Sequence, residues 1–290
     1  MSDAADLRAR AEAHAAPLPP LLADAEHLAS TMLLGEHGRR RAGMGDEFWQ
    51  YRPAMASDEA RLIDWRRSAR SDTHYVREKE WQAAQSILIW VDDSQSMEFA
   101  SPDHPTKAYR GQVLAMAVAL LLLRGGERVG LTGHDVPPRR GELQLLRMAA
   151  ALLSDPIEGD YGAPVVQGMM TKSRALFVSD FLGPLDGVEA ALTQAADRGV
   201  RGALLQILDP TEEAFPFDGR TVFESMSGTI QHETLQAASL RDRYLDRLSE
   251  RKDRLAGLAR LTGWQYHCHH TGESAQAALL WLFRAMEKTR

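Results

Sequence analysis

Cysteine is almost absent, since the chain of 290 residues contains only Cys268. A single cysteine cannot form an intrachain disulfide, so we expect a reducing, cytoplasmic location. The opening residues lack the basic and then apolar pattern of an export signal, and none is expected. Long apolar runs are lacking as well. The longest, from Val113 to Leu123, has eleven residues, whereas a helix that crosses a bilayer needs about 20.

Several motifs of enzymes are also missing. The sequence has no phosphate-binding loop, no Gly-x-Gly-x-x-Gly turn and no His-Glu-x-x-His helix, so nucleotide-binding and protease functions lose support. The formal net charge of −6 does not favour nucleic acid or an anionic membrane as a partner. The run from His267 to His270 contains side chains that bind zinc, but neighbours on a strand point to opposite faces. We interpret it as an ordinary strand end.

From residue 86 onward, short apolar runs alternate with longer helical stretches. This alternation is typical of an α/β fold with a mainly parallel sheet flanked by helices. Strands are expected over 86–91, 128–132, 174–179, 203–208 and 264–268, with a small strand over 222–224. Helices are expected over 107–124, 142–153, 165–172, 185–197 and 274–288. The helix over 107–124 is apolar on nearly every face, so it requires cover on most sides.

The domain organisation follows from this pattern. Residues 1–82 begin with an Ala-, Leu- and Pro-rich stretch, and we expect them to form an accessory segment that packs on the main domain. Residues 83–290 are expected to form the main domain, with a long helix inserted over 233–262. Its segment from Arg241 to Arg254 contains ten charges of both signs, which predicts a solvated helix with i, i+4 ion pairs. The alternative is a lever that docks a partner.

The residues that carry chemistry follow the first expected strand. Asp92, Ser94 and Ser96 have the spacing Asp-x-Ser-x-Ser, and Asp180 follows another buried strand. Ligands of open parallel sheets bind at the carboxyl ends of the strands, so these oxygens are expected to converge. Magnesium prefers about six oxygen ligands and keeps several waters, which suits such a set. The alternative is a capped turn, in which the hydroxyls bind the amino end of a helix.

This arrangement resembles the metal-ion-dependent adhesion site of von Willebrand factor type A domains. The resemblance implies a Rossmann-like fold and a site for Mg²⁺, or another divalent cation such as Mn²⁺, at Asp92, Ser94, Ser96 and Asp180. The family pattern also has a threonine in an intervening loop, which corresponds here to residues 159–163. Ala163 takes that place, so Asp160 or water is expected to supply the missing oxygen, or the ion is held weakly.

A second resemblance covers roughly residues 33–210. The stretches at 34–39, 45–53, 61–70 and 75–80, together with Ser179-Asp180-Phe181, are similar to a bacterial von Willebrand-like family of proteins, domain of unknown function 58. Members of that family commonly occur with MoxR-type AAA+ ATPases, so the resemblance implies such an ATPase as a partner. Arg61, Asp64, Trp65, Arg66 and Arg70 are interpreted as locking an extended segment against the sheet domain. The alternative is that the arginines at 39–41 and 66–70 form an exposed basic surface for an acidic partner or nucleic acid.

Two classes of function remain. The first is a non-catalytic, metal-dependent protein-binding module, in which a partner carboxylate completes the coordination of the ion. In the form implied by the second resemblance, it is an adaptor between the ATPase and an unknown client protein. The alternative is a magnesium-dependent phosphatase or hydrolase that uses Asp92 or Asp93. The sequence favours the binding module, because no second spaced carboxylate follows Asp92.

Overall fold

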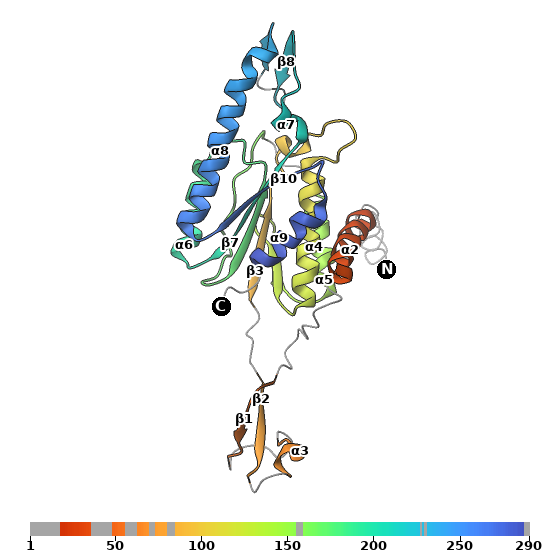
Figure 1. Ribbon diagram of the computed structural model, residues 1–290, viewed down its shortest axis with the longest axis vertical. Coiled ribbons are helices and arrows are strands. Elements are labelled where there is room, and N and C mark those ends of the chain that lie inside the picture. Colours follow the sequence, from red (N-terminus) through yellow and green to blue (C-terminus); the bar gives the residue numbers. More distant parts are fainter. Residues whose placement is uncertain are drawn as a thin grey trace, which may run out of the picture. The chain divides into compact units, whose positions relative to one another are not determined.

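The computed structural model describes residues 18–35, 48–55, 63–69, 73–79, 85–154, 159–226, 228 and 231–286 (Figure 1). The chain forms two compact units. The larger contains Met1–Gly35 and Gln85–Arg290, and the smaller contains Glu36–Ala84. The arginines expected at 39–41 and the residues at 61 and 70 lie outside the described residues.

The smaller unit contains a two-stranded antiparallel sheet. Its strands are β1 (Phe48–Pro53) and β2 (Tyr75–Lys79), and a single helical turn, α3 (Trp65–Ser68), lies between them in the chain. The Ser68 hydroxyl donates to the carbonyl of Asp64 at 2.8 Å and accepts from the amide of Tyr75 at 2.9 Å. This hydroxyl therefore joins the turn to β2.

The larger unit is built on a six-stranded sheet in the order β10-β7-β6-β3-β4-β5. Neighbouring strands are parallel except β4 and β5, which are antiparallel. Because strands along the chain are added first to one side of β3 and then to the other, the order reverses beside β3. The expected fold class, a mainly parallel α/β sheet flanked by helices, is confirmed. The bounds are β3 (Ser86–Val91), β4 (Arg128–Leu131), β5 (Val136–Arg139), β6 (Arg174–Ser179), β7 (Arg201–Leu208) and β10 (Gln265–His270).

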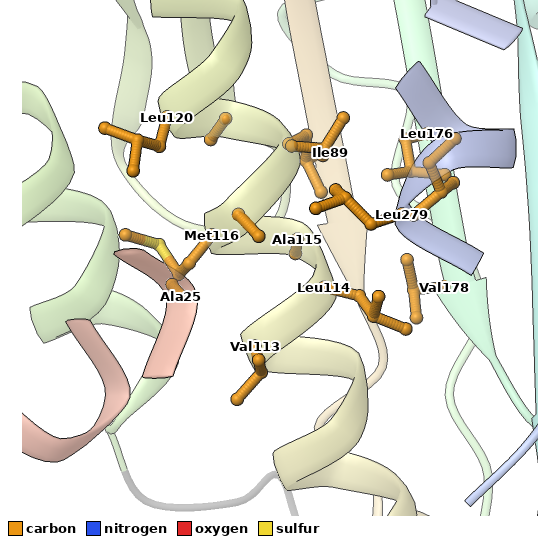
Figure 2. Close-up of a cluster of buried hydrophobic side chains, with 14 of the residues drawn as sticks. Ala25, Ile89, Val113, Leu114, Ala115, Met116, Leu120, Leu176, Val178 and Leu279 are labelled. Carbon is orange, nitrogen blue, oxygen red and sulfur yellow. The ribbon is translucent and has the colours of Figure 1, made fainter. Parts of the chain in front are cut away.

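One face of this sheet is covered by α4 (Lys107–Arg124), α5 (Glu142–Leu152) and α9 (Ala275–Met286). In Figure 2, Leu114 and Leu279 point toward Ile89, Leu176 and Val178 of the sheet. Alternate residues of β3 serve the opposite face, where Leu88 and Trp90 belong to a second cluster. That face is covered by α6 (Asp186–Asp197) and α8 (Arg241–Thr262).

Helix α2 (Leu18–Gly35) covers the outer side of α4. Ala25 of α2 lies beside Met116, and both side chains are at most 2% exposed (Figure 2). The apolar character of α4 on nearly every face is thereby explained, because its two sides are buried against the sheet and against α2. The domain boundary predicted at residue 82 differs from the division in the structure, because residues 18–35 belong to the larger unit. None of the described helices is long and apolar enough to cross a membrane.

Two expected elements need correction, and one strand was not expected. The helix expected over 233–262 begins at Arg241, because Gln231–Thr234 (β9) pairs antiparallel with Thr221–Glu224 (β8) and a 3-10 turn, η3 (Ala237–Leu240), follows. Residues 165–172 are not helical: the Thr132 hydroxyl donates to the carbonyl of Val165, and Gly168 has a left-handed φ of 83°. Strand β5 was not expected because it contains Pro137 and Pro138, which an edge strand tolerates.

Candidate metal and partner-binding site

The carboxyl ends of three neighbouring strands carry buried carboxylates. Asp92 follows β3, Asp180 follows β6 and Asp209 follows β7, and none of the three is more than 2% exposed. The amide of Asp92 donates to the carbonyl of Val178 in β6 at 2.8 Å. The structure thus brings the two predicted aspartates, Asp92 and Asp180, to the same edge of the sheet.

Asp92 is held in one orientation by two hydrogen bonds. One carboxylate oxygen accepts from the amide of Ser94 at 3.0 Å, and the other accepts from the hydroxyl of Ser179 at 2.6 Å. Burial raises the pKa of Asp92 above its ordinary value, the bonds from Ser179 and Ser94 oppose that rise, and the nearby Asp180 adds to it. Both oxygens of Asp92 are thus fixed in direction by hydrogen bonds, and each keeps a lone pair for a further donor or an ion.

Asp92 also has no cationic side chain as a partner among the described residues. Buried carboxylates in proteins are usually paired with a cation or coordinate a metal. Among the described residues, a charge on Asp92 is therefore stabilised by the hydrogen bonds from Ser94 and Ser179 and not by a cation.

The two predicted serines lie beside each other after β3. Their hydroxyl oxygens are 3.5 Å apart. Ser94 precedes the 3-10 turn η2 (Gln95–Glu98), and within the described chain its side chain makes no capping bond to that turn. The capped-turn alternative therefore does not describe Ser94. Two oxygens about 2.1 Å from one magnesium ion lie about 3 Å apart when they are adjacent ligands, so a small approach of the two hydroxyls would let both bind one ion.

The loop at residues 159–163 rests against this turn. The amide of Gln95 donates to the carbonyl of Gly159 at 3.0 Å, and the amide of Ser96 donates to the carbonyl of Asp160 at 2.9 Å. Gly162 lies so near Asp92 that a Cβ there would be 2.3 Å from a carboxylate oxygen. The Asp160 side chain borders the same cavity as Ser96 and Asp180. The predicted loop is thus at the site, whereas Ala163 brings no side-chain oxygen to it.

Sequence reasoning missed a buried cation at the site. Lys107, the first residue of α4, is 1% exposed, and its ammonium donates to Asp180 at 2.9 Å and to Glu212 at 2.6 Å. Burial alone lowers the pKa of Lys107, but Asp180 and Glu212 raise it above its ordinary value. The signal in the sequence was a lysine at the start of an otherwise apolar helix. Counting Asp92 as well, three carboxyl groups and one ammonium gather at the site, and burial raises the pKa of both Asp92 and Glu212.

The donor chemistry fits a hard divalent cation held at low affinity. Hydroxyls and carboxylates are the ligands that magnesium and manganese prefer. The described residues include no cluster of three or more His, Cys, Asp or Glu side chains able to hold an ion, so an ion here would depend on the hydroxyls of Ser94 and Ser96 as well. Of the predicted set, Asp92, Asp160 and Asp180 would supply carboxylate oxygens, directly or through water. Lys107 competes with the ion for Asp180, and Ala163 removes one oxygen.

The three imidazoles between His267 and His270 are engaged in packing and polar contacts, and those of His269 and His270 both approach the Glu273 carboxylate, at 3.6 and 3.4 Å. His267 stacks on Trp281 with ring centroids 4.9 Å apart, Nε2 of His269 lies 3.1 Å from the Arg110 guanidinium, and His270 pairs with Glu213. Successive residues of β10 therefore serve packing and hydrogen bonding on different sides of the strand.

Helix α8 supports the loop that follows β6. The guanidinium of Arg251 donates to the carbonyl of Phe181 at 2.8 Å and to that of Gly183 at 2.5 Å. The buried side chains of Leu255 and Ala259, further along α8, pack into the second apolar cluster. The helix is therefore not only a solvated one: it fixes the backbone beside Asp180.

Comparison with known proteins gives one family and several distant relatives. The sequence profile of the family described as "Protein of unknown function DUF58" matches residues 50–254. The uncharacterized protein Rv1480 of Mycobacterium tuberculosis (strain H37Rv) is 26% identical over 227 residues, which are 73% of this chain and 70% of that relative.

Two solved structures align with the chain. The first is an aerotolerance-related membrane protein from Bacteroides fragilis, with a TM-score of 0.39 and 13% identity over 70% of this chain and 98% of that chain. The second is the SpRpn10 VWA domain, with a TM-score of 0.35 and 11% identity over 68% of this chain and 94% of that chain.

Proposed function

The chain belongs to the DUF58 family of proteins of unknown function, and from this premise we propose that it is a non-catalytic protein-binding module whose site takes a divalent cation. The observation that carries the proposal is Asp92, a carboxylate that is 2% exposed, bonded by Ser94 and Ser179, and without a cationic partner among the described residues. A divalent cation beside Ser94 and Ser96 would compensate that charge. A carboxylate of the partner would then complete the coordination of the ion.

The proposed partner is a MoxR-type AAA+ ATPase, and the module would connect it with a client protein in the cytoplasm. This part rests on the resemblance of the sequence to its family. The site agrees with a role in which ATP hydrolysis belongs wholly to the partner, because its groups are oxygens at a strand end and not a phosphate-binding loop.

The ion is tested by unfolding experiments with and without Mg²⁺ or Mn²⁺. At about 100 times the dissociation constant, the ion should raise the free energy of unfolding by about 2.7 kcal/mol. Asp92→Ala should abolish this response, because the second carboxylate is already paired with Lys107. Asp93→Ala is the matched control, since the neighbouring side chain is only half-buried, and it should respond as the wild type does. An unchanged response in the Asp92→Ala, Asp180→Ala double variant would exclude the site.

The partner is tested by mixing the purified protein with the MoxR-type ATPase of the same organism. Binding is measured first without nucleotide, in Mg²⁺ and in chelator, and ATP turnover is measured afterwards. We expect chelator or Asp92→Ala to weaken the complex by at least about tenfold, equivalent to 1.4 kcal/mol, and Asp93→Ala to leave it unchanged. If no complex forms in any condition, the adaptor role is wrong; if Asp92→Ala binds as tightly as the wild type, the ATPase docks elsewhere.

A further inference from the structure

A cavity of about 550 Å³ opens beside the strand-end site. Ser96, Asp160 and Asp180 border one end of it, and its other walls come from α7 (Pro210–Ala214), the β8–β9 hairpin and the first turns of α8. Figure 1 shows α7 and β8 beside the start of α8. Cavities of about 300–1,000 Å³ are typical of ligand sites. The cavity therefore has the size of a binding site and adjoins the proposed ion.

The walls away from the ion are aromatic. The ring of Phe215 stacks on that of Phe223 with centroids 5.6 Å apart, and it lies 4.9 Å from the ring of Tyr244. Phe217 meets Phe223 edge to face at 5.2 Å. Phe215 has a φ of 43°, in the left-handed region that non-glycine residues rarely adopt. In this rarely adopted backbone conformation, the ring of Phe215 belongs to the aromatic cluster.

The exposed charged residues in the lining of the cavity are two arginines and one acid, Glu224. Arg243 and Arg247 lie one turn apart on α8, line the cavity and are exposed. Within the part of the chain that the structure describes, neither guanidinium has a hydrogen-bond or ion-pair partner. Arg251, one turn further along, is by contrast committed to the loop after β6. Two arginines without a partner among the described residues, in the same lining as an aromatic cluster, favour a ligand that carries both negative charge and an apolar group.

We propose that this cavity binds an acidic segment of the partner protein that presents one large apolar side chain between flanking carboxylates. The apolar side chain enters the cluster of Phe215, Phe223 and Tyr244, and the carboxylates pair with Arg243 and Arg247. Tyr and Arg are enriched among the few residues that carry most of the binding energy of protein interfaces. The inference rests on the proposed function, because it names the chemistry of the segment that would deliver a carboxylate to the ion.

The test uses the full chain and blocked tripeptides as probes. The methyl resonance of Met226, which lines the cavity and is 47% exposed, is followed by NMR in chelator during titration with acetyl-Glu-Phe-Glu-amide. We expect a saturable shift with a dissociation constant of about 1 mM, the weak range appropriate to a fragment. Acetyl-Lys-Phe-Lys-amide and acetyl-Glu-Ala-Glu-amide should bind at least about tenfold more weakly, since each lacks one half of the proposed recognition.

Variants identify the groups responsible. Arg243→Ala with Arg247→Ala should weaken the acidic peptide by at least about tenfold, whereas Arg260→Ala, which removes an exposed arginine from the last turn of the same helix, should leave its binding unchanged. Asp92→Ala should bind the peptide as the wild type does, so failure of the ion site and failure of this cavity are told apart. The proposal is overturned if no shift occurs up to about 10 mM, or if the acidic, basic and alanine peptides bind equally.

Discussion

Replacing Lys107 with Met should lower the free energy of unfolding by about 3–5 kcal/mol, the cost of removing one partner from a buried ion pair. Met has a similar length and fills the space, so the loss reflects charge and not a cavity. The ammonium is 1% exposed and bonds Asp180, which is also 1% exposed, and Glu212, which is 15% exposed. Both carboxylates would be left in the protein interior without their cation.

The measurement is urea unfolding of the wild type and three variants. Lys107→Met combined with Asp180→Asn and Glu212→Gln should recover most of the lost stability, because the neutral amides need no cation. Lys172→Met, which changes an exposed lysine, should stay within about 0.5 kcal/mol of the wild type. A loss below about 1 kcal/mol in Lys107→Met would show that these three side chains are not electrostatically coupled in the folded protein.

The same variant connects stability with the proposed ion. Removing the ammonium takes away the cation that pairs with Asp180 and Glu212, and it frees Asp180 for a metal. Lys107→Met should therefore gain more stability from Mg²⁺ than the wild type does. In the wild type, the pairing of Lys107 with Asp180 would therefore keep the affinity for the ion low. A partner carboxylate would then contribute more to the coordination of the ion than it would without Lys107.

The strand-end carboxylates were predictable because they depend on local pattern. Apolar runs locate β3 and β6, and the carboxyl ends of parallel strands lie at one edge of the sheet, so Asp92 and Asp180 had to be near each other. The position of each aspartate directly after a strand was enough to predict that the two lie close together, and no knowledge of side-chain packing was needed.

Lys107 and its partners could not be predicted in the same way. The ammonium joins residues that are 73 and 105 positions away in the chain. No periodic pattern reports such a contact, which depends on where α4 and α7 are placed by the packing of the whole sheet. The start of α8 at Arg241 was missed for a related reason, since the four-residue strand β9 is too short to show an alternation and depends on pairing with β8.

Gly202 lies where two strands approach each other closely, which the sequence also does not reveal. Gly202→Ala should lower the free energy of unfolding by more than about 4 kcal/mol, beyond the range of most point changes. Gly202 pairs with Ala175 across β6 and β7. A Cβ at this position would lie 1.8 Å from the carbonyl oxygen of Ala175 and 3.0 Å from the ring of Trp264. The obstacle is the backbone of a buried strand, which cannot rotate away as a flexible side chain can.

The change should also reach the binding site, because Gln206 of β7 donates to the carbonyl of Asp180 at 2.7 Å. Moving β7 away from β6 would break this bond and release the backbone that presents Asp180. Gly257→Ala is the matched control: no described atom lies within 4 Å of a Cβ there. In the helix α8 it should stabilise the protein by about 0.5–1 kcal/mol. Urea unfolding measures both changes, and a Gly202→Ala variant as stable as Gly257→Ala would mean that β6 and β7 separate at little cost and do not hold Asp180 in place.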